Sequence, residues 1–321
     1  MPFVSLVVSK VSATTKQCAT TGTSSKHQRL VVRRPLTKAT VRMTQPEATS
    51  KAEAQPVATA GGKILVIGGN GYLATRVLEK AMQKGYRVTA LSRHPPKEFL
   101  RDNPKLQGVR WIQGDALDPE PWKHELQDAT AVVVATADYR WRDLFGNQRY
   151  LQQVCGETGL SVSKAACGFA NIQKFAFVSA HHYPPFVKLL PGYFKGKDDA
   201  EYQINHDFGS RAILLRPGFL YGKRTTTFFG KRVVLPLDWF ARPFEYLAVG
   251  SLSRMVASMF GRNYLFHPPL NVEDVARVVI AGITGDIDKL IPKTEESRAL
   301  VLESMDMYGI ADKLRHEVVI R

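Results

Sequence analysis

The hydrophobic positions of this chain fall into short apolar runs that alternate with segments of helical spacing. Residues 63–67, KILVI, are typical of a strand buried on both faces of a parallel sheet. In residues 71–84 apolar side chains recur every three to four positions, which predicts a helix that stops at Gly85. Further strands are predicted at 87–92, 109–113, 131–137, 174–180 and 212–215, and a later helix at 272–283. This alternation predicts an α/β fold with a doubly wound parallel sheet.

Two segments depart from the alternation. Residues 228–269 are rich in aromatic and aliphatic side chains with scattered arginines, and we expect helices there that cover the substrate side of the sheet. These helices either complete the core, lie on a lipid surface or wall an apolar substrate pocket. Residues 286–321 are charged and amphipathic, and the pattern assigns them only to a C-terminal tail.

The N-terminal residues differ in charge from the rest of the chain. The 321 residues carry a formal net charge of +15, and residues 1–46 hold eight basic residues, 13 Ser or Thr and no acid. That composition is typical of an organelle transit peptide, with a basic disordered tail as the alternative. The hydroxyl content favours a plastid over a mitochondrion. Residues 47–61, rich in Ala, Pro and Thr, are predicted to be a linker, which leaves 62–285 as the main domain.

Composition narrows the functional classes further. No run of about 18 apolar residues occurs, so no transmembrane helix is predicted. The cysteines, Cys18, Cys155 and Cys167, form neither a metal-binding pattern nor a disulfide framework. The remaining chain stays basic, which keeps RNA binding as a weak alternative, but no RNA-binding motif supports it.

A glycine-rich loop joins the first strand to the first helix. Gly68 suits a tight turn with positive φ, Gly71 lets the backbone approach a pyrophosphate, and Ala74 keeps the helix close to the sheet. The helix N-terminus then presents N–H groups and a positive dipole end to phosphates. This strand–loop–helix context predicts a Rossmann dinucleotide site. Its expected members are Gly68, Gly69, Asn70, Gly71, Tyr72, Leu73 and Ala74.

The end of the second strand indicates which dinucleotide is bound. An NAD site usually carries an acid there, about 20 residues beyond the loop, to hold the ribose 2′-hydroxyl. Residues 89–94 contain no acid, whereas Ser92 and Arg93 suit a 2′-phosphate, so NADP is favoured over NAD. Asp115, at the end of the third strand, is either a contact for the adenine amine or an ordinary turn residue.

A tyrosine and a lysine four residues apart suggest proton chemistry. Tyr193 and Lys197 would share one helix face, where the ammonium favours the phenolate and would also hold the nicotinamide ribose. Chance alone yields about 0.7 such pairs in this composition, so position matters more than spacing. Ser179 ends the fifth strand at the edge that faces the cofactor and could bond a substrate oxygen. An exposed, unrelated Tyr and Lys is the alternative.

With these motifs, the chain resembles the atypical short-chain dehydrogenase/reductases. The carrying residues are 68–74, 114–115, Tyr193 and Lys197 followed by Glu201, 216–222 and 271–274. Within that family, 192–197 and 215–224 look most like a group of plastid plastoglobule-associated and fungal mitochondrial coenzyme-Q-linked proteins. The resemblance implies NAD(P) at the glycine loop and a quinone or prenyl-lipid context. In that family, active members usually carry an Asn on the helix before the fifth strand; the resemblance places that position near Cys155, and Asn147 lies eight residues earlier.

We therefore expect an NADP-dependent reductase of an apolar carbonyl or quinone-like substrate, with Tyr193 as proton donor, Lys197 tuning it and Ser179 orienting the oxygen. The substrate would be an apolar small molecule, and peripheral association with a membrane or lipid particle fits the same context. A non-catalytic NAD(P)-binding subunit or assembly factor of a membrane-associated complex is the alternative. No metal and no specific nucleic acid is expected.

Overall fold

The computed structural model describes residues 62–96, 98–137, 147–182, 184–228, 231–236, 269–291 and 298–319. All of them belong to one compact unit, Glu53–Arg321. The predicted transit peptide (1–46) and linker (47–61) lie outside the described residues, and so does most of 228–269.

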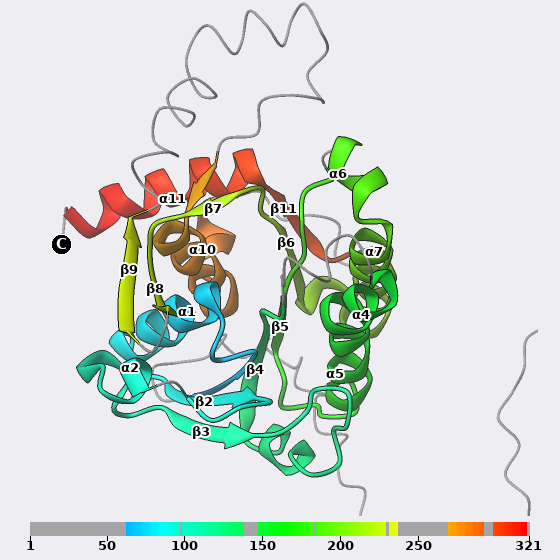
Figure 1. Ribbon diagram of the computed structural model, residues 1–321, viewed down its shortest axis with the longest axis horizontal. Coiled ribbons are helices and arrows are strands. Elements are labelled where there is room, and N and C mark those ends of the chain that lie inside the picture. The colour runs from blue at the N-terminus through cyan, green and yellow to red at the C-terminus, as the bar shows by residue number, and fades with distance from the viewer. Residues whose placement is uncertain are drawn as a thin grey trace, which may run out of the picture. The chain divides into compact units, whose positions relative to one another are not determined.

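A seven-stranded sheet forms the centre, and every pair of neighbouring strands is parallel (Figure 1). The order β3–β2–β1–β4–β5–β6–β11 reverses direction at β1, where the chain crosses to the other half of the sheet. This topology confirms the predicted doubly wound Rossmann fold. The strands are β1 (Lys63–Ile67), β2 (Arg87–Ser92), β3 (Arg110–Gln113), β4 (Ala129–Val134), β5 (Lys174–Val178), β6 (Ala212–Arg216) and β11 (Leu300–Glu303).

Helices cover both faces of the sheet because alternate strand residues point to opposite sides. In β1, Ile64 and Val66 join the apolar core beneath α1 (Tyr72–Gln83), α10 (Val272–Thr284) and α11 (Ser304–Val319). Leu65 and Ile67 join the opposite core, which α5 (Thr158–Ala166) and α7 (Pro191–Phe208) complete. Figure 1 shows the two helical layers on either side of the sheet.

The C-terminal segment belongs to the sheet and is not a separate tail. β11 lies parallel to β6, and α11 returns over α10, where Met307, Ile310 and Ala311 are buried. The sequence boundary at residue 285 was therefore too early. The pattern missed β11 because it is a four-residue edge strand that ends in an acid and buries one side chain, Leu302, so it shows no continuous apolar run.

The predicted helical region begins with a β-hairpin instead. β8 (Lys223–Phe228) and β9 (Lys231–Pro236) pair antiparallel, so the expectation of helices was wrong for 231–236. These strands contain β-branched Thr and Val, which favour extended backbone. Residues 237–268 lie outside the described residues.

The remaining elements are short. Strands β7 (Leu220–Tyr221) and β10 (Leu270–Asn271) pair with each other, and the short helices are α2 (Glu98–Arg101), α4 (Gln148–Gln152) and α6 (Pro184–Leu189). Single helical turns occupy Pro104–Leu106, Lys123–Leu126, Gln153–Glu157, Gly209–Arg211 and Asp286–Lys289. Among the described helices, none combines the length and the apolar character needed to cross a membrane.

Candidate nucleotide and catalytic site

The glycine loop is fixed against the second strand by backbone hydrogen bonds. The N–H groups of Gly68 and Gly69 both donate to the Leu91 oxygen, at 2.8 and 3.1 Å. Gly68 has φ of +88°, and a Cβ there would also lie 2.8 Å from the Ala135 oxygen. The sequence expectation that this turn needs a glycine at position 68 is therefore met for two reasons, conformation and space.

Gly71 closes the loop and opens the helix. Its N–H donates to the Gly68 oxygen at 2.7 Å, and a Cβ would lie 2.9 Å from that oxygen. Gly71 offers no side-chain cap, and the first turn of α1, Tyr72 to Ala74, contains no acid. First-turn N–H groups have no acceptor within their own helix, so this end of α1 suits an anionic group such as a pyrophosphate.

Asn70 connects the glycine loop to the segment after β2. Its Nδ2 donates to the His94 and Pro95 oxygens at 2.9 and 3.0 Å, and Ser92 Oγ donates to the same His94 oxygen at 2.8 Å. The Asn70 Oδ1 atom is buried and has no hydrogen-bond partner among the described residues. A buried acceptor without a donor is costly, and a bound ligand that carries N–H or O–H groups fits this position.

Two residues expected to contact the cofactor, Arg93 and Asp115, are exposed. The Arg93 side chain is exposed, and its carbonyl accepts from Gln113 Nε2 at 3.2 Å. Asp115 is also exposed, and its Oδ1 accepts the Leu117 N–H at 3.0 Å, as in a polar turn. The structure thus shows a turn role for Asp115, and its contact with adenine stays a prediction.

Lys197 is a fully buried lysine on α7, with 1% of its surface exposed. Its Nζ donates to the Val178 oxygen at 2.7 Å and the Thr136 oxygen at 3.3 Å, and it lies 4.6 Å from the centre of the Phe177 ring. Burial lowers the pKa of Lys197 to about 8, although the nearby Cys155 and Glu201 side chains oppose that shift. A lysine with this pKa can exchange a proton near neutral pH.

Tyr193 and Ser179 lie close to this lysine. Lys197 Nζ is 6.0 Å from the centre of the Tyr193 ring, and Tyr193 shares a small buried cluster with Ala180, the residue after Ser179. The Ser179 N–H donates to the Leu215 oxygen at 2.7 Å, whereas its buried Oγ has no partner among the described residues. The fold therefore brings Ser179, Tyr193 and Lys197 together at the carboxyl end of β5.

Glycines let α7 lie very close to the helix that precedes β5. A Cβ on Gly192 would meet the Gln148 oxygen, and a Cβ on Gly196 would lie 2.8 Å from the Gln152 oxygen. A Cβ on Gly156 would overlap the Gly196 oxygen. Gly156 lies in a π-helical turn, Gln153–Glu157, that also buries Cys155. The glycine at 196, unfavourable in an isolated helix, thus allows this crossing.

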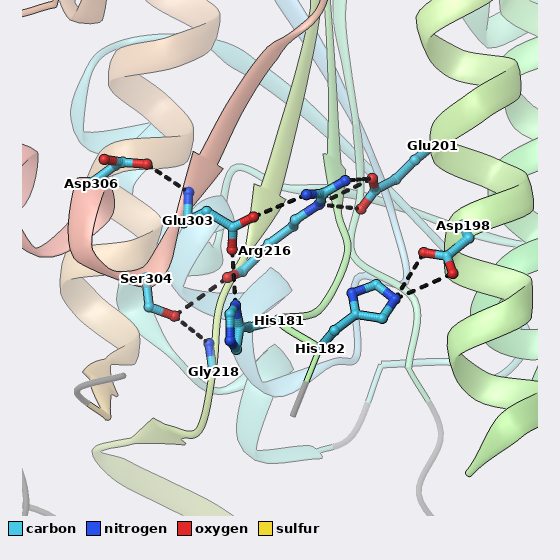
Figure 2. A network of polar contacts seen from close by, with 9 residues as sticks. All are labelled: His181, His182, Asp198, Glu201, Arg216, Gly218, Glu303, Ser304 and Asp306. Carbon is cyan, nitrogen blue, oxygen red and sulfur yellow. Dashed lines mark hydrogen bonds and ion pairs between the residues drawn. The ribbon is translucent and has the colours of Figure 1, made fainter. Parts of the chain in front are cut away.

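A network of charged side chains lies beside the catalytic candidates (Figure 2). Arg216, at the end of β6, makes a bidentate contact with Glu201 of α7, through Nε at 3.1 Å and through Nη2. Its Nη1 donates to Glu303 Oε1 at 2.9 Å, and Glu303 Oε2 lies 3.0 Å from His181 Nδ1. The pKa of Arg216 is raised, mainly by its hydrogen bonds with Glu201.

The two histidines after β5 contact different elements. His181 pairs with Glu303 of β11, and His182 lies 3.0 Å from the Asp198 carboxylate of α7. Tyr183, the next residue, lies outside the described residues. Sequence reasoning missed Glu303 because its strand shows no apolar pattern, and it missed the Asn70 contacts because they depend on the path of residues 94–95. Among the described residues, no group of His, Cys, Asp and Glu is arranged to hold a metal ion.

Topology and glycine loop together define a dinucleotide-binding protein, and comparisons with known proteins agree. Residues 68–234 match the NAD(P)H-binding family. An uncharacterised chloroplastic protein of Arabidopsis thaliana is 31% identical over 228 residues, which cover 70% of this chain and 72% of that protein. The chain belongs to this NAD(P)-binding Rossmann family and matches its atypical short-chain dehydrogenase/reductase group.

Two more similarities were found, one to part of a protein and one to a solved structure. A protein of Trieres chinensis named photosystem II assembly factor Ycf39 is 34% identical over 127 residues, 39% of this chain and 37% of that protein. The structure of WbmF from Bordetella bronchiseptica, in complex with NAD+ and UDP, aligns with a TM-score of 0.50 at 16% identity over 76% of this chain and 73% of that chain. The second similarity supports the fold alone.

Proposed function

We propose that this protein is an NADP-dependent reductase of an apolar carbonyl or quinone-like substrate, such as a prenyl lipid. The observation that carries the proposal is the buried Ser179 Oγ, which has no partner in the described part of the chain, beside Tyr193 and the buried ammonium of Lys197. A hydroxyl donor, a phenol and a tuned lysine at one strand end are what carbonyl reduction needs from a protein.

In this proposal the bound dinucleotide supplies a hydride. Ser179 Oγ donates a hydrogen bond to the substrate oxygen and orients it. Tyr193 Oη transfers its proton to the same oxygen as the carbonyl becomes an alcohol. The Lys197 ammonium stabilises the phenolate left behind, and Val178 and Thr136 hold that ammonium in place through their carbonyl oxygens.

The choice of NADP rests on residues 92 and 93. Residues 89–94 contain no acid to accept a ribose 2′-hydroxyl, and the exposed Arg93 guanidinium suits a 2′-phosphate. The loop residues Gly68, Gly69, Gly71 and Asn70, together with the first turn of α1, would hold the pyrophosphate and ribose. Asp115 would contact the adenine.

An apolar substrate fits the surroundings of the site. Phe219 follows the end of β6 and is 60% exposed, and Met305 follows the end of β11 and is 47% exposed. Large apolar side chains exposed at the carboxyl edge of the sheet favour an apolar ligand or a lipid surface there. We propose a plastid location, with a mitochondrion as the alternative, because residues 1–46 have a transit-peptide composition and a relative is named chloroplastic.

The second candidate is a nucleotide-binding assembly factor without turnover. The similarity of 127 residues to a protein named as a photosystem II assembly factor favours it. In that case the dinucleotide would stabilise the fold, and Tyr193 would serve only in packing.

One experiment separates the two candidates. The full chain is given NADPH and short-chain quinones, and NADPH oxidation is followed in the parent and in Tyr193→Phe. Tyr202→Phe is the matched control, because Tyr202 lies on the same helix and is 78% exposed. We expect at least a hundredfold loss of kcat in Tyr193→Phe alone. Cofactor binding without turnover in all three proteins would refute the reductase, and equal turnover would remove Tyr193 from the mechanism.

A further inference from the structure

Three elements far apart in the sequence meet at Arg216. The residue ends β6 and lies opposite Glu303 in the register of β11, while Glu201 reaches it from α7. Figure 2 shows the guanidinium between the two carboxylates, with Glu201 on the α7 side and Glu303 on the β11 side. The C-terminal strand is therefore connected to the catalytic helix through one arginine.

Glu201 is one helical turn after Lys197, and both residues are at least 95% buried. Residues four apart share a helix face, so the Glu201 carboxylate lies on the same face of α7 as the lysine, and its charge raises the pKa of Lys197. Its two oxygens are occupied by Arg216. The positive charge of Arg216 cancels the effect of the Glu201 charge on Lys197 unless another carboxylate balances Arg216.

Glu303 provides that balance. Burial raises the pKa of Glu303, but hydrogen bonds from His181 and Arg216 outweigh burial and hold the pKa below its usual value, so the group is ionised at neutral pH. Ser304, the next residue, fixes this corner: its Oγ accepts the Gly218 N–H at 2.8 Å. The Glu303 N–H donates to Asp306 at 3.0 Å.

We propose that Glu303 is a positioning residue that acts through Arg216 and Glu201 to keep the Lys197 ammonium charged. The segment of residues 298–319 is then part of the working site and not only of the sheet. The catalytic meaning of this inference rests on the proposed reductase function, but the electrostatic coupling itself does not.

The groups that face Lys197 come from several elements. From α7 the lysine faces Glu201 and the Tyr193 ring, from the π-helical turn Cys155, and from β5 the Phe177 ring and the Val178 oxygen. The Thr136 oxygen comes from the segment after β4. Glu303 itself faces Arg216 and His181.

The test measures the titration of Lys197 in the cofactor-free full chain by NMR with lysine labelled at Cε. The Lys197 signal is assigned by its absence in Lys197→Met. We expect Glu303→Gln to move the Lys197 midpoint to lower pH by about half a pH unit, because the Arg216 cation loses one of its balancing charges. Arg216→Gln tests the same coupling with the opposite sign and should raise the midpoint.

Asp286→Asn is the matched control. Asp286 also pairs with a cation and has the same side-chain exposure as Glu303, 34%, but it pairs with Lys84 on the opposite face of the sheet. It should leave the midpoint unchanged. If Glu303→Gln does not fold, Arg216→Gln decides the matter.

An unmoved midpoint in the folded variants, or an equal shift in Asp286→Asn, would overturn the inference. The measurement needs neither NADPH nor turnover, so its failure and the failure of the reductase proposal are separate results. In an active enzyme, the alkaline limit of kcat should move in the same direction as the midpoint.

Discussion

The helix crossing beneath the catalytic candidates makes Gly156→Ala a strong test of the structure. A methyl group at this position would overlap the oxygen, carbonyl carbon and Cα of Gly196. These are backbone atoms of α7, so no side chain can rotate away. The two helices would have to separate or the π-helical turn would have to rearrange.

Two opposing terms set the magnitude. Replacing glycine by alanine in a helix interior raises the free energy of unfolding by about 1 kcal/mol. Forcing an extra methyl group into a packed core costs about 1–3 kcal/mol, and an overlap with backbone atoms belongs at the upper end of that range. We therefore expect Gly156→Ala to lower the free energy of unfolding by about 2 kcal/mol. Tyr193 and Lys197 lie on the displaced helix, so turnover should fall as well.

The measurement is urea unfolding of the full chain, followed by far-ultraviolet circular dichroism. Gly309→Ala is the matched control: Gly309 lies in α11, and a Cβ there would meet nothing within 4 Å. Gly309→Ala should raise the free energy of unfolding by about 0.5–1 kcal/mol through helix propensity alone. If Gly156→Ala is as stable as the parent, the close crossing of the two helices is wrong.

Two further predictions concern the cofactor and the buried lysine. Arg93→Asp should weaken NADPH binding at least tenfold while NADH binding changes little. The reason is that about 1.5–3 kcal/mol of charge-assisted hydrogen bonding to a 2′-phosphate is lost. Equal losses of affinity for both dinucleotides in fluorescence titrations would refute the NADP assignment. The pKa of Lys197 is lowered from 10.5 to about 8 on folding, so its buried charge destabilises the protein below pH 8 and this penalty fades as the pH rises towards 10.5. The stability of the parent relative to Lys197→Met should therefore rise by about 2 kcal/mol between pH 7 and pH 10, and a constant difference in urea unfolding would contradict the depressed pKa.

Much of the fold was predictable because its strands are buried on both faces. The strands at 63–67 and 87–92 match β1 and β2, and the others agree to within a few residues. Two later elements carry no such signal. β11 and the hairpin β8–β9 depend on pairing partners elsewhere in the chain, and a single sequence window does not contain them.

The catalytic candidates were predictable in identity but not in their surroundings. Spacing placed Tyr193 and Lys197 on one face of a helix, and strand position placed Ser179 near them. Nothing in the pattern joined Glu303 to this group, because a separation of 87 residues lies between it and Arg216. Polar networks of this kind depend on the register of β11 against β6, which only the folded sheet defines.

Gly196 shows how a residue can look unfavourable in the sequence and be required in the structure. Within an isolated helix it costs about 1 kcal/mol relative to alanine, which argues against a well-formed catalytic helix. In the fold, its missing side chain lets Gly156 approach, with a Cβ on Gly196 only 3.2 Å from the Gly156 Cα. That approach places the π-helical turn and Cys155 near Lys197, the residue that follows Gly196. Gly196 therefore lowers the helix propensity of α7 but allows the close crossing beside Lys197, because a Cβ there would lie 2.8 Å from the Gln152 oxygen.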